Sequence, residues 1–406
     1  MNLIPIEGGV CAAKGFTAAG IHCGIRKNRT KKDLALIYSE TECAVGCTYT
    51  QNKVYGAPIT VTRENVKNGK AKAIVCNSGN ANTCNANGVE IAQQMCLLTG
   101  QALGIDPGDV VVASTGVIGQ PLSIEPIQKS LPALVSQLSH AGSTDACEGI
   151  MTTDTYPKQA AYEFTLGGAT CHIGAIAKGS GMIHPNMATM LAFLTTDVAI
   201  TPTLLQKAVS AVVDDTFNMV SVDGDTSTND MLSVLANGLA GNPLIDSENE
   251  LYADFKQALF TVCENISKKL AGDGEGATKL LECTVSQAPA KDIAKKIAKS
   301  VICSSLFKTA MFGADANWGR ILCAIGYTEA EFDISKISVD LSSKAGQIHV
   351  CENGAGVPFS EDEAKKVLLE EEVHVEINMH DGTASATAWG CDLTYDYVKI
   401  NGDYRT

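Results

Sequence analysis

The chain is organised around the stretch KGSGMIHPNMATMLAFL, residues 178–194. It begins with Lys178 and a glycine-rich turn, passes Pro185, and becomes continuously apolar after Thr189. Proline fixes its own φ angle and biases the preceding residue towards an extended conformation, and glycine allows backbone shapes that other residues avoid. The pattern therefore predicts a bent loop that delivers Ala188 and Thr189 to the start of a buried strand.

The bond between Ala188 and Thr189 has two interpretations. In one, it simply begins the strand. In the other, Thr189 Oγ attacks the Ala188 carbonyl, the peptide rearranges to an ester, and water splits the ester. Thr189 would then be an N-terminal residue whose own α-amino group acts as the base for its hydroxyl. Such a group has a reference pKa of about 7.7 to 8.0, so much of it is unprotonated near neutrality. Spacing alone leaves both interpretations open.

Length and composition bound the class of protein. A chain of 406 residues exceeds a typical single core, so we expect two or three domains. An apolar share of 45% with 19% charged residues is typical of a compact globule. The net charge is −14 and no long basic run exists, which argues against binding to phosphate backbones. Nucleic acid is therefore not an expected partner.

The cellular context follows from what the sequence lacks. The first residues have no basic start or apolar core of a signal peptide, and no run approaches the roughly 18 apolar residues of a membrane helix. We therefore expect a cytoplasmic protein without a membrane partner. The 15 cysteines are scattered and odd in number, as expected for reduced thiols. Cys43 and Cys47 are spaced CxxxC, but no second pair completes a zinc set, so no metal site is expected.

Apolar periodicity predicts helices and strands on both sides of Thr189, which indicates an α/β fold. The predicted strands cover residues 34–37, 57–62, 71–75, 109–113, 160–166, 171–177, 190–194, 373–379 and 385–391. The predicted helices cover residues 90–103, 123–138, 201–217, 251–270, 290–303 and 360–370. Residues 311–320 are expected to form a loop, and the tail, residues 395–406, is expected to dock on the body of the protein.

Several polar loops separate these elements. The run from Asn77 to Gly88 is either a polar wall of a site or a turn rich in Asn because Asn tolerates left-handed φ angles. The acidic, hydroxyl-rich run from Ser221 to Asp230 lacks the oxygen spacing of a calcium loop and predicts a turn near the site.

The glycine run from Gly272 to Lys279 is a third polar loop, and it lacks the spacing of a phosphate loop. Glu275 stands among its glycines, where a carboxylate suits a substrate ammonium better than an anion.

One strand ends in chemistry-bearing residues, Ser114-Thr115-Gly116. A hydroxyl and a backbone N–H at such a point can be directed together, as an oxyanion hole requires. An ordinary strand-to-loop turn is the alternative for this segment. Lys178 likewise has two interpretations, a cation for a substrate carboxylate or a solvated surface lysine.

Eight segments resemble the ornithine acetyltransferase family, the self-processing glutamate N-acetyltransferases of arginine biosynthesis. They occur in the family's order over nearly the whole chain. They are Asn77 to Asn82, Ser114 to Gly119, Met151 to Thr155, Lys178 to Asp197, Ser221 to Asp230, Gly272 to Lys279, Lys308 to Arg320 and Asn401 to Thr406. That many ordered matches are very improbable by chance.

The resemblance implies roles for individual residues. Thr189 would be the nucleophile, and cleavage would fall between Ala188 and Thr189. Thr115 and Gly116 would form the oxyanion hole. Contacts to the substrate would come from Thr152, Lys178, Thr189, Glu275, Asn401 and Thr406.

The resemblance also implies an architecture. It is an α/β fold, a layered α-β-β-α sandwich with a second, smaller α/β domain, formed jointly by two self-cleaved chains. The α chain would be residues 1–188 and the β chain residues 189–406 with its N-terminal threonine. Two copies of each would form an α₂β₂ heterotetramer.

The implied activity moves acetyl from N2-acetyl-L-ornithine to L-glutamate through an acetyl-threonine intermediate. The products would be L-ornithine and N-acetyl-L-glutamate. No bound cofactor is expected, and acetyl-CoA is left open as a co-substrate. One alternative is a self-processing amidase or aminopeptidase, which would give the acyl group to water. The other is a non-enzymatic binding protein with an intact Thr189.

Overall fold

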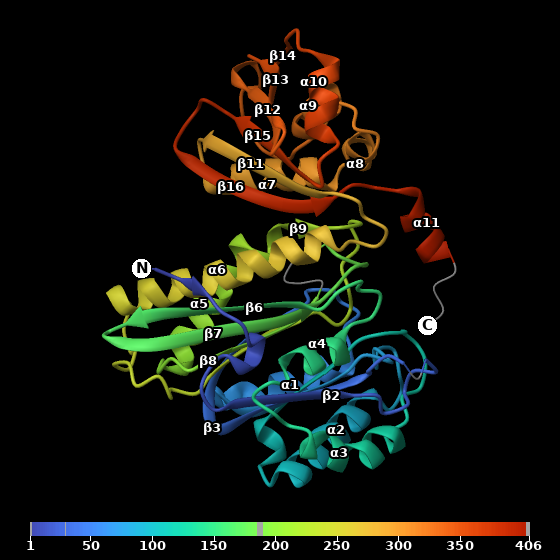
Figure 1. The fold of residues 1–406 in the computed structure, drawn as a ribbon, viewed down its shortest axis with the longest axis vertical. Helices are drawn as coiled ribbons and strands as arrows, with labels where there is room; N and C mark the ends of the chain where they lie inside the picture. Colours follow the sequence, from blue (N-terminus) through green and yellow to red (C-terminus); the bar gives the residue numbers. More distant parts are fainter. Residues whose placement is uncertain (1, 29, 185–189, 403–406) are drawn as a thin grey trace.

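The computed structural model describes residues 2–28, 30–184 and 190–402, which form two lobes (Figure 1). The larger lobe is built on a nine-stranded sheet and the smaller lobe on a seven-stranded sheet. Helices cover both sheets. The expected α/β class with a second, smaller α/β unit is confirmed.

The large sheet has the order β1-β6-β7-β8-β10-β3-β4-β5, with β2 paired to β3. Its strands are β1 (Ile4–Pro5), β2 (Phe16–Ile21), β3 (Leu34–Tyr49), β4 (Lys70–Asn77), β5 (Val110–Ser114), β6 (Lys158–Leu166), β7 (Ala169–Lys178), β8 (Leu191–Thr196) and β10 (Met231–Ala236). Strand β8 runs antiparallel to β7 and parallel to β10. The two strands that follow Thr189 in the sequence, β8 and β10, therefore lie between strands that precede it.

Helices cover the large sheet on both sides. They are α1 (Ala57–Asn65), α2 (Gly88–Leu103), α3 (Glu125–Ser136), α4 (Ser143–Ile150), α5 (Pro202–Asp215) and α6 (Glu250–Gly272). Helices α5 and α6 pack on the half formed by β6, β7, β8 and β10, and α2 and α3 pack on the half around β4 and β5. A third cluster, which includes α4, fills the space between the halves.

The two β layers expected from the sequence are thus two halves of one hydrogen-bonded sheet. Strand β3 joins them, because it pairs with β10 near one end and with β2 near the other. Its pairing with β4 shifts register between Tyr38 and Cys43. This irregularity lies where the strand passes from one half to the other.

The smaller lobe has its own buried core. Its strands are β9 (Val220–Ser221), β11 (Leu280–Ala288), β12 (Ser338–Ser343), β13 (Gly346–Glu352), β14 (Ala355–Gly356), β15 (Glu372–Asn378) and β16 (Ala384–Cys391). Its helices are α7 (Lys291–Cys303), α8 (Ser305–Phe312), α9 (Trp318–Gly326) and α10 (Glu361–Leu368). Helix α11 (Tyr395–Gly402) leaves this lobe and reaches down beside the larger one (Figure 1).

Three predictions about local structure were wrong. Residues 57–62 form the start of α1, because Pro58 suits the first turn of a helix and Ile59 and Val61 turn to the core. Residues 311–320 are not one loop, since α9 begins at Trp318. The described part of the tail is a helix whose Tyr395 is 84% exposed, so it docks only in part.

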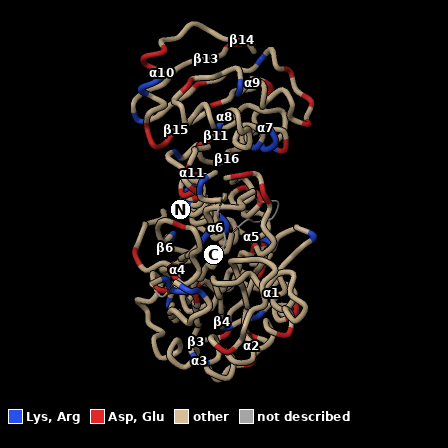
Figure 2. Tube along the Cα trace, turned by 90° about the vertical axis from the view of Figure 1, so that its right-hand side faces the viewer, with Lys and Arg blue, Asp and Glu red and all other residues tan. Residues whose placement is uncertain are grey.

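Charges of both signs are spread over both lobes (Figure 2). In the described ranges, no helix is long and apolar enough to cross a membrane.

Candidate functional site

The stretch that organises the sequence connects β7 to β8. These strands are neighbours, and Lys178 at the end of β7 is paired with Leu191 at the start of β8. The connection therefore leaves and re-enters the sheet at one point. Ala188 and Thr189 belong to residues 185–189, which lie outside the described residues.

The first half of this connection is held by the segment from Ser221 to Asp230. Asp223 accepts hydrogen bonds from the N–H groups of Met182 and Ile183, at 2.6 and 2.8 Å. Thr226 Oγ1 donates to the carbonyl of His184 at 2.9 Å. This acidic segment therefore lies against the loop that leads towards Ala188, as the prediction of a turn near the site requires.

The far end of the connection is held by Met231, the residue that directly follows the segment from Ser221 to Asp230. The N–H of Met231 donates to the carbonyl of Met190 at 3.0 Å. The neighbouring Asp230 is 2% exposed, and its Oδ2 has no hydrogen-bond partner in the described part of the chain. Burial raises the pKa of Asp230 well above its ordinary value, which favours the neutral form of this carboxyl.

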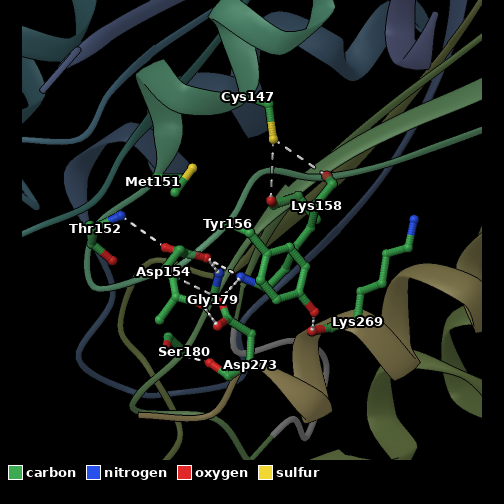
Figure 3. A network of polar contacts seen from close by, with 12 residues as sticks. Cys147, Met151, Thr152, Asp154, Tyr156, Lys158, Gly179, Ser180, Lys269 and Asp273 are labelled. Carbon is green, nitrogen blue, oxygen red and sulfur yellow. Dashed lines mark hydrogen bonds and ion pairs between the residues drawn. The ribbon is translucent and has the colours of Figure 1, made fainter. Parts of the chain in front are cut away.

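A buried ionic network lies behind the loop (Figure 3). Lys158, which is fully buried, forms ion pairs with Asp154, at 2.7 Å, and with Asp273. Burial opposes the charge of Asp154, but attraction to Lys158 and then to Lys178 prevails and lowers its pKa to about 2. Against its own burial, the two carboxylates raise the pKa of Lys158. Asp154 and Lys158 are therefore both charged at neutral pH.

The network connects three segments of the site. Asp154 accepts from the N–H of Gly179 at 2.7 Å and from the N–H of Thr152 at 2.9 Å. Ser180 Oγ donates to the carbonyl of Asp273 at 2.5 Å. Since these segments come from distant parts of the chain, Lys158 fixes them relative to one another (Figure 3).

Lys178 stands at the end of β7 and is 8% exposed. Burial lowers its pKa, while attraction to Asp154 acts in the opposite direction. The solvated surface lysine considered for this position is wrong. A buried ammonium next to the loop can instead bind a carboxylate that enters the site.

Glu275 lies against the other side of the loop. It is 7% exposed, and its N–H donates to the carbonyl of Ser180 at 2.9 Å. A Cβ added to Gly181 would come within 2.4 Å of the Glu275 carboxylate, so this carboxylate lies directly against the loop. Asn401 Nδ2 donates to Glu275 Oε2 at 2.6 Å. The structure thus brings these two predicted contacts together, while Thr406 lies outside the described residues.

Thr115 and Gly116 follow β5 and pack against the loop that begins at Asn77. The N–H of Thr115 is already bound to the carbonyl of Asn77, at 2.9 Å. Gly116 has φ +128°, and a Cβ there would come within 2.8 Å of the backbone of Gly79 and Asn80. The donors left for an oxyanion are therefore the Thr115 hydroxyl and the Gly116 N–H.

This Asn-rich loop is tied to the segment after Thr189. Asn229 Nδ2 donates to the carbonyls of Ala81 and Ser114, at 2.6 and 2.9 Å. Thr83 Oγ1 in turn donates to Asn229 Oδ1 at 2.6 Å. Of the two interpretations of the loop, a wall of the site is the one that this packing supports.

A cavity of about 410 Å³ joins two of the predicted site residues, Gly116 and Thr152. Its other lining residues are Ile25, Arg26, Lys27, Asn28, Lys31, Ser78, Gly79, Val117 and Gln120. Lys178 and Glu275 are not among them. The candidate site is therefore a chain of contacts along the loop, with a cavity beside the oxyanion donors.

Sequence reasoning missed five residues that build the site. They are Asp154, Lys158, Asp223, Asn229 and Asp273. All except Lys158 lie inside segments that the sequence had marked as motifs, so position was available as a signal but partners were not. Within the described ranges, no three His, Cys, Asp or Glu residues form a group that could hold a metal ion.

Comparisons with known proteins cover the whole chain. The model of the ArgJ family matches residues 17–406. The chain is 50% identical over 403 residues to the "Arginine biosynthesis bifunctional protein ArgJ" of Symbiobacterium thermophilum, covering 99% of both chains. It is 51% identical over 392 residues to the protein ArgJ 1 of Clostridium acetobutylicum, covering 96% of both. A crystal structure of the Bacillus halodurans protein argJ is 47% identical with a TM-score of 0.51, and covers 53% of this chain and 100% of that one.

Proposed function

The chain belongs to the ArgJ family and is an acetyltransferase of arginine biosynthesis, and we propose that Thr189 carries the acetyl group between its two substrates. Thr189 Oγ takes acetyl from N2-acetyl-L-ornithine and releases L-ornithine. L-glutamate then accepts the acetyl group and leaves as N-acetyl-L-glutamate. The observation that carries the proposal is that Gly116 and Thr152, far apart in the sequence, line one cavity.

The chemistry needs a base and a place for negative charge. The free α-amine of Thr189 takes the hydroxyl proton and returns it to the leaving amine. Each half of the reaction passes through a tetrahedral oxyanion, which the Thr115 hydroxyl and the Gly116 N–H stabilise. One such donor contributes about 2.7 to 4 kcal/mol in other enzymes.

The amino-acid part of each substrate is held by the other residues of the site. Lys178 binds the α-carboxylate that both substrates carry, and Glu275 with Asn401 binds the side-chain ammonium of N2-acetyl-L-ornithine, because the charges are complementary. Thr152 and Thr406 contribute further polar contacts. The burial of Lys178 and Glu275 supports these roles, since ion pairs gain strength where water is excluded.

The amine is created by self-cleavage. Thr189 Oγ adds to the Ala188 carbonyl, the C–N bond breaks, and the released nitrogen gains a proton. Water then hydrolyses the ester, leaving chains of residues 1–188 and 189–406, which assemble as α₂β₂. In support, the crystallised Bacillus halodurans chain, which is matched over its full length, covers 53% of this chain. Residues 189–406 make up a similar share of the sequence.

A second donor is consistent with the relatives being named bifunctional proteins. We assign this role to acetyl-CoA, whose thioester would acetylate Thr189 in place of acetylornithine. The enzyme needs no bound cofactor for either route. We propose that both reactions take place in the cytoplasm.

One experiment tests the proposal. The purified protein is mixed briefly with N2-acetyl-L-ornithine, and its intact mass is measured. Two chains are expected, with the 189–406 chain heavier by one acetyl group. On adding L-glutamate, the extra mass should disappear as N-acetyl-L-glutamate forms. Release of acetate instead would identify the amidase alternative, and a single unmodified chain would overturn the proposal.

A further inference from the structure

The cavity beside Gly116 has an unusual outer wall. The connection between β2 and β3 supplies Arg26, Lys27 and Lys31 to it, and among the described residues no Asp or Glu lines the cavity. The whole chain carries a net charge of −14, so this is a local reversal of sign. The cavity therefore offers cations to whatever enters beside the oxyanion donors.

Hydrogen bonds hold the described part of this wall in place. Asp33 is fully buried, and its carboxylate accepts from the N–H groups of Cys23 and Arg26, at 2.5 and 2.8 Å. His22 Nδ1 lies 3.0 Å from the carbonyl of Lys31. These contacts fold the connection back on itself and place the two lysines on the cavity side.

Arg26 fastens the wall to the rest of the site. Its Nε donates to the carbonyl of Ser78 at 3.0 Å, and its Nη2 donates to the carbonyl of Met151. The contact is close, because a Cβ on Gly79 would come within 2.3 Å of Ile25. The wall is thus held against the segments that carry Gly116 and Thr152.

Lys27 and Lys31 differ from Arg26, whose guanidinium binds backbone carbonyls, in their exposure and in their contacts. Both are exposed, and in the described part of the chain neither forms an ion pair with a carboxylate. The next residue, Lys32, is paired with Asp145 and Glu148. Two cations in a cavity without a carboxylate are therefore available to an incoming anion.

Building on the proposed function, we propose that Lys27 and Lys31 form an anion subsite for the charged end of a co-substrate whose reacting end lies at Gly116. Two sources supply such an anion. One is the phosphate groups of acetyl-CoA, and the other is the γ-carboxylate of L-glutamate. The side chain of N2-acetyl-L-ornithine ends in an ammonium, which is proposed to lie against Glu275, so this substrate gains nothing from the two lysines.

The charges of the substrates give the subsite a ranking. The phosphates of acetyl-CoA carry several negative charges, and L-glutamate offers one beyond its α-carboxylate. Because interactions of exposed charges are screened by salt, the advantage of the anionic substrates should shrink as ionic strength rises. The cavity of about 410 Å³ holds L-glutamate or one part of the larger donor.

The test is the double variant Lys27→Gln/Lys31→Gln. Its KM for acetyl-CoA should rise about tenfold, which corresponds to about 1.4 kcal/mol, and the rise should fall at high salt. S-acetylpantetheine has the same thioester without phosphates, so its KM should change less than about twofold. In a second arm, the KM for L-glutamate is measured with N2-acetyl-L-ornithine as donor.

The control is Lys53→Gln/Lys256→Gln, which removes the same charge from two exposed lysines that do not line this cavity. A rise for acetyl-CoA alone assigns the subsite to the phosphates, and a rise for L-glutamate alone assigns it to the γ-carboxylate. Unchanged KM values in both arms, or an equal rise for S-acetylpantetheine, would overturn the inference.

An assay without turnover separates this inference from the proposed function. Inorganic pyrophosphate is titrated by calorimetry into the unsubstituted protein and into both double variants. Binding that is lost only in Lys27→Gln/Lys31→Gln supports the subsite even in a protein that transfers no acetyl group. Absence of binding to the unsubstituted protein, together with an unchanged KM for L-glutamate, would refute it.

Discussion

Asn401 donates a hydrogen bond from Nδ2 to Glu275 Oε2, with 2.6 Å between the two atoms. The bond ties the last described helix, α11, to the loop that follows α6. Asn401 also donates to the carbonyl of Tyr397 at 3.0 Å, so its amide is oriented from within its own helix. The carboxylate that faces the loop after Lys178 is thus held from the carboxyl-terminal part of the described chain.

The first prediction concerns this carboxylate. Glu275→Gln keeps the shape but removes the charge proposed to hold a substrate ammonium. A lost charged hydrogen bond of about 1.5 to 3 kcal/mol should lower kcat/KM for transfer about 10- to 150-fold, with cleavage unchanged. Steady-state kinetics and a denaturing gel measure the two effects. Glu371→Gln, at an exposed position, is the control, and normal kinetics in Glu275→Gln would remove the residue from the site.

The second prediction concerns self-cleavage. Thr189→Ala lacks the attacking hydroxyl and should remain one polypeptide in intact mass measurements, whereas Thr189→Ser should still be cut. Two fragments from the alanine variant would show that another agent cuts the chain. The uncut variant should also form no acetyl-enzyme.

The third prediction tests whether both reactions share one oxyanion hole. Thr115→Ala removes a hydroxyl donor without touching its N–H, which is bound to Asn77. Loss of a donor worth about 2.7 to 4 kcal/mol should slow cleavage and transfer about 10²- to 10³-fold. Thr41→Ala, in β3, gives a control for loss of a threonine hydroxyl. Normal rates for both reactions in Thr115→Ala would exclude the hydroxyl from the hole.

The fourth prediction compares two buried aspartates whose pKa values move in opposite directions. Asp154 is paired with Lys158, which lowers its pKa, whereas burial raises the pKa of Asp230. Asp154→Asn leaves a buried ammonium with less compensation and should lower the free energy of unfolding by about 3 kcal/mol. Asp230→Asn removes a carboxyl whose charged form is disfavoured by burial, and it should change the free energy of unfolding by less than about 1 kcal/mol.

Urea unfolding in the uncut Thr189→Ala background measures both variants, because chain separation then does not contribute. Equal losses in the two variants would contradict the assigned charge states.

The fifth prediction is a pH dependence. The pKa of Asp154 is about 2 in the folded protein and 3.8 ordinarily, so its ionisation stabilises the fold above pH 4. This contribution, about 2 kcal/mol, is lost as pH falls towards 2. The difference in unfolding free energy between Thr189→Ala and its Asp154→Asn derivative should therefore shrink from about pH 5 to pH 2. A difference that stays constant would place the carboxylate outside the ionic network.

Much of the fold could be predicted from local pattern. The periodicities that predicted strands at 71–75 and 171–177 and a helix at 251–270 correspond to β4, β7 and α6. The prediction for residues 57–62 was wrong because their β-branched side chains resemble a strand. Pro58 lies in the first turn and is compatible with a helix start, and tertiary packing decides the outcome.

The site was predictable in its parts but not in its connections. Motifs placed Thr152, Lys178 and Glu275 near one another in function, and the structure links their segments through Asp154, Lys158 and Asp273. Lys158 lies in no motif. One of its partners, Asp154, is four residues away in the sequence, but the other, Asp273, is 115 residues away. Pairings of this kind arise from topology, which single-residue patterns do not encode.

The interleaving of β8 and β10 between β7 and β3 has a consequence for the life of the molecule. If the bond before Thr189 is cut after folding, the sheet first forms from one continuous chain. After denaturation it must then form again from two separate chains. Recovery from denaturant would then depend on protein concentration for the mature enzyme and not for its uncut precursor. Such a protein would fold readily as a single chain, but the cleaved protein would refold only when its two chains associate.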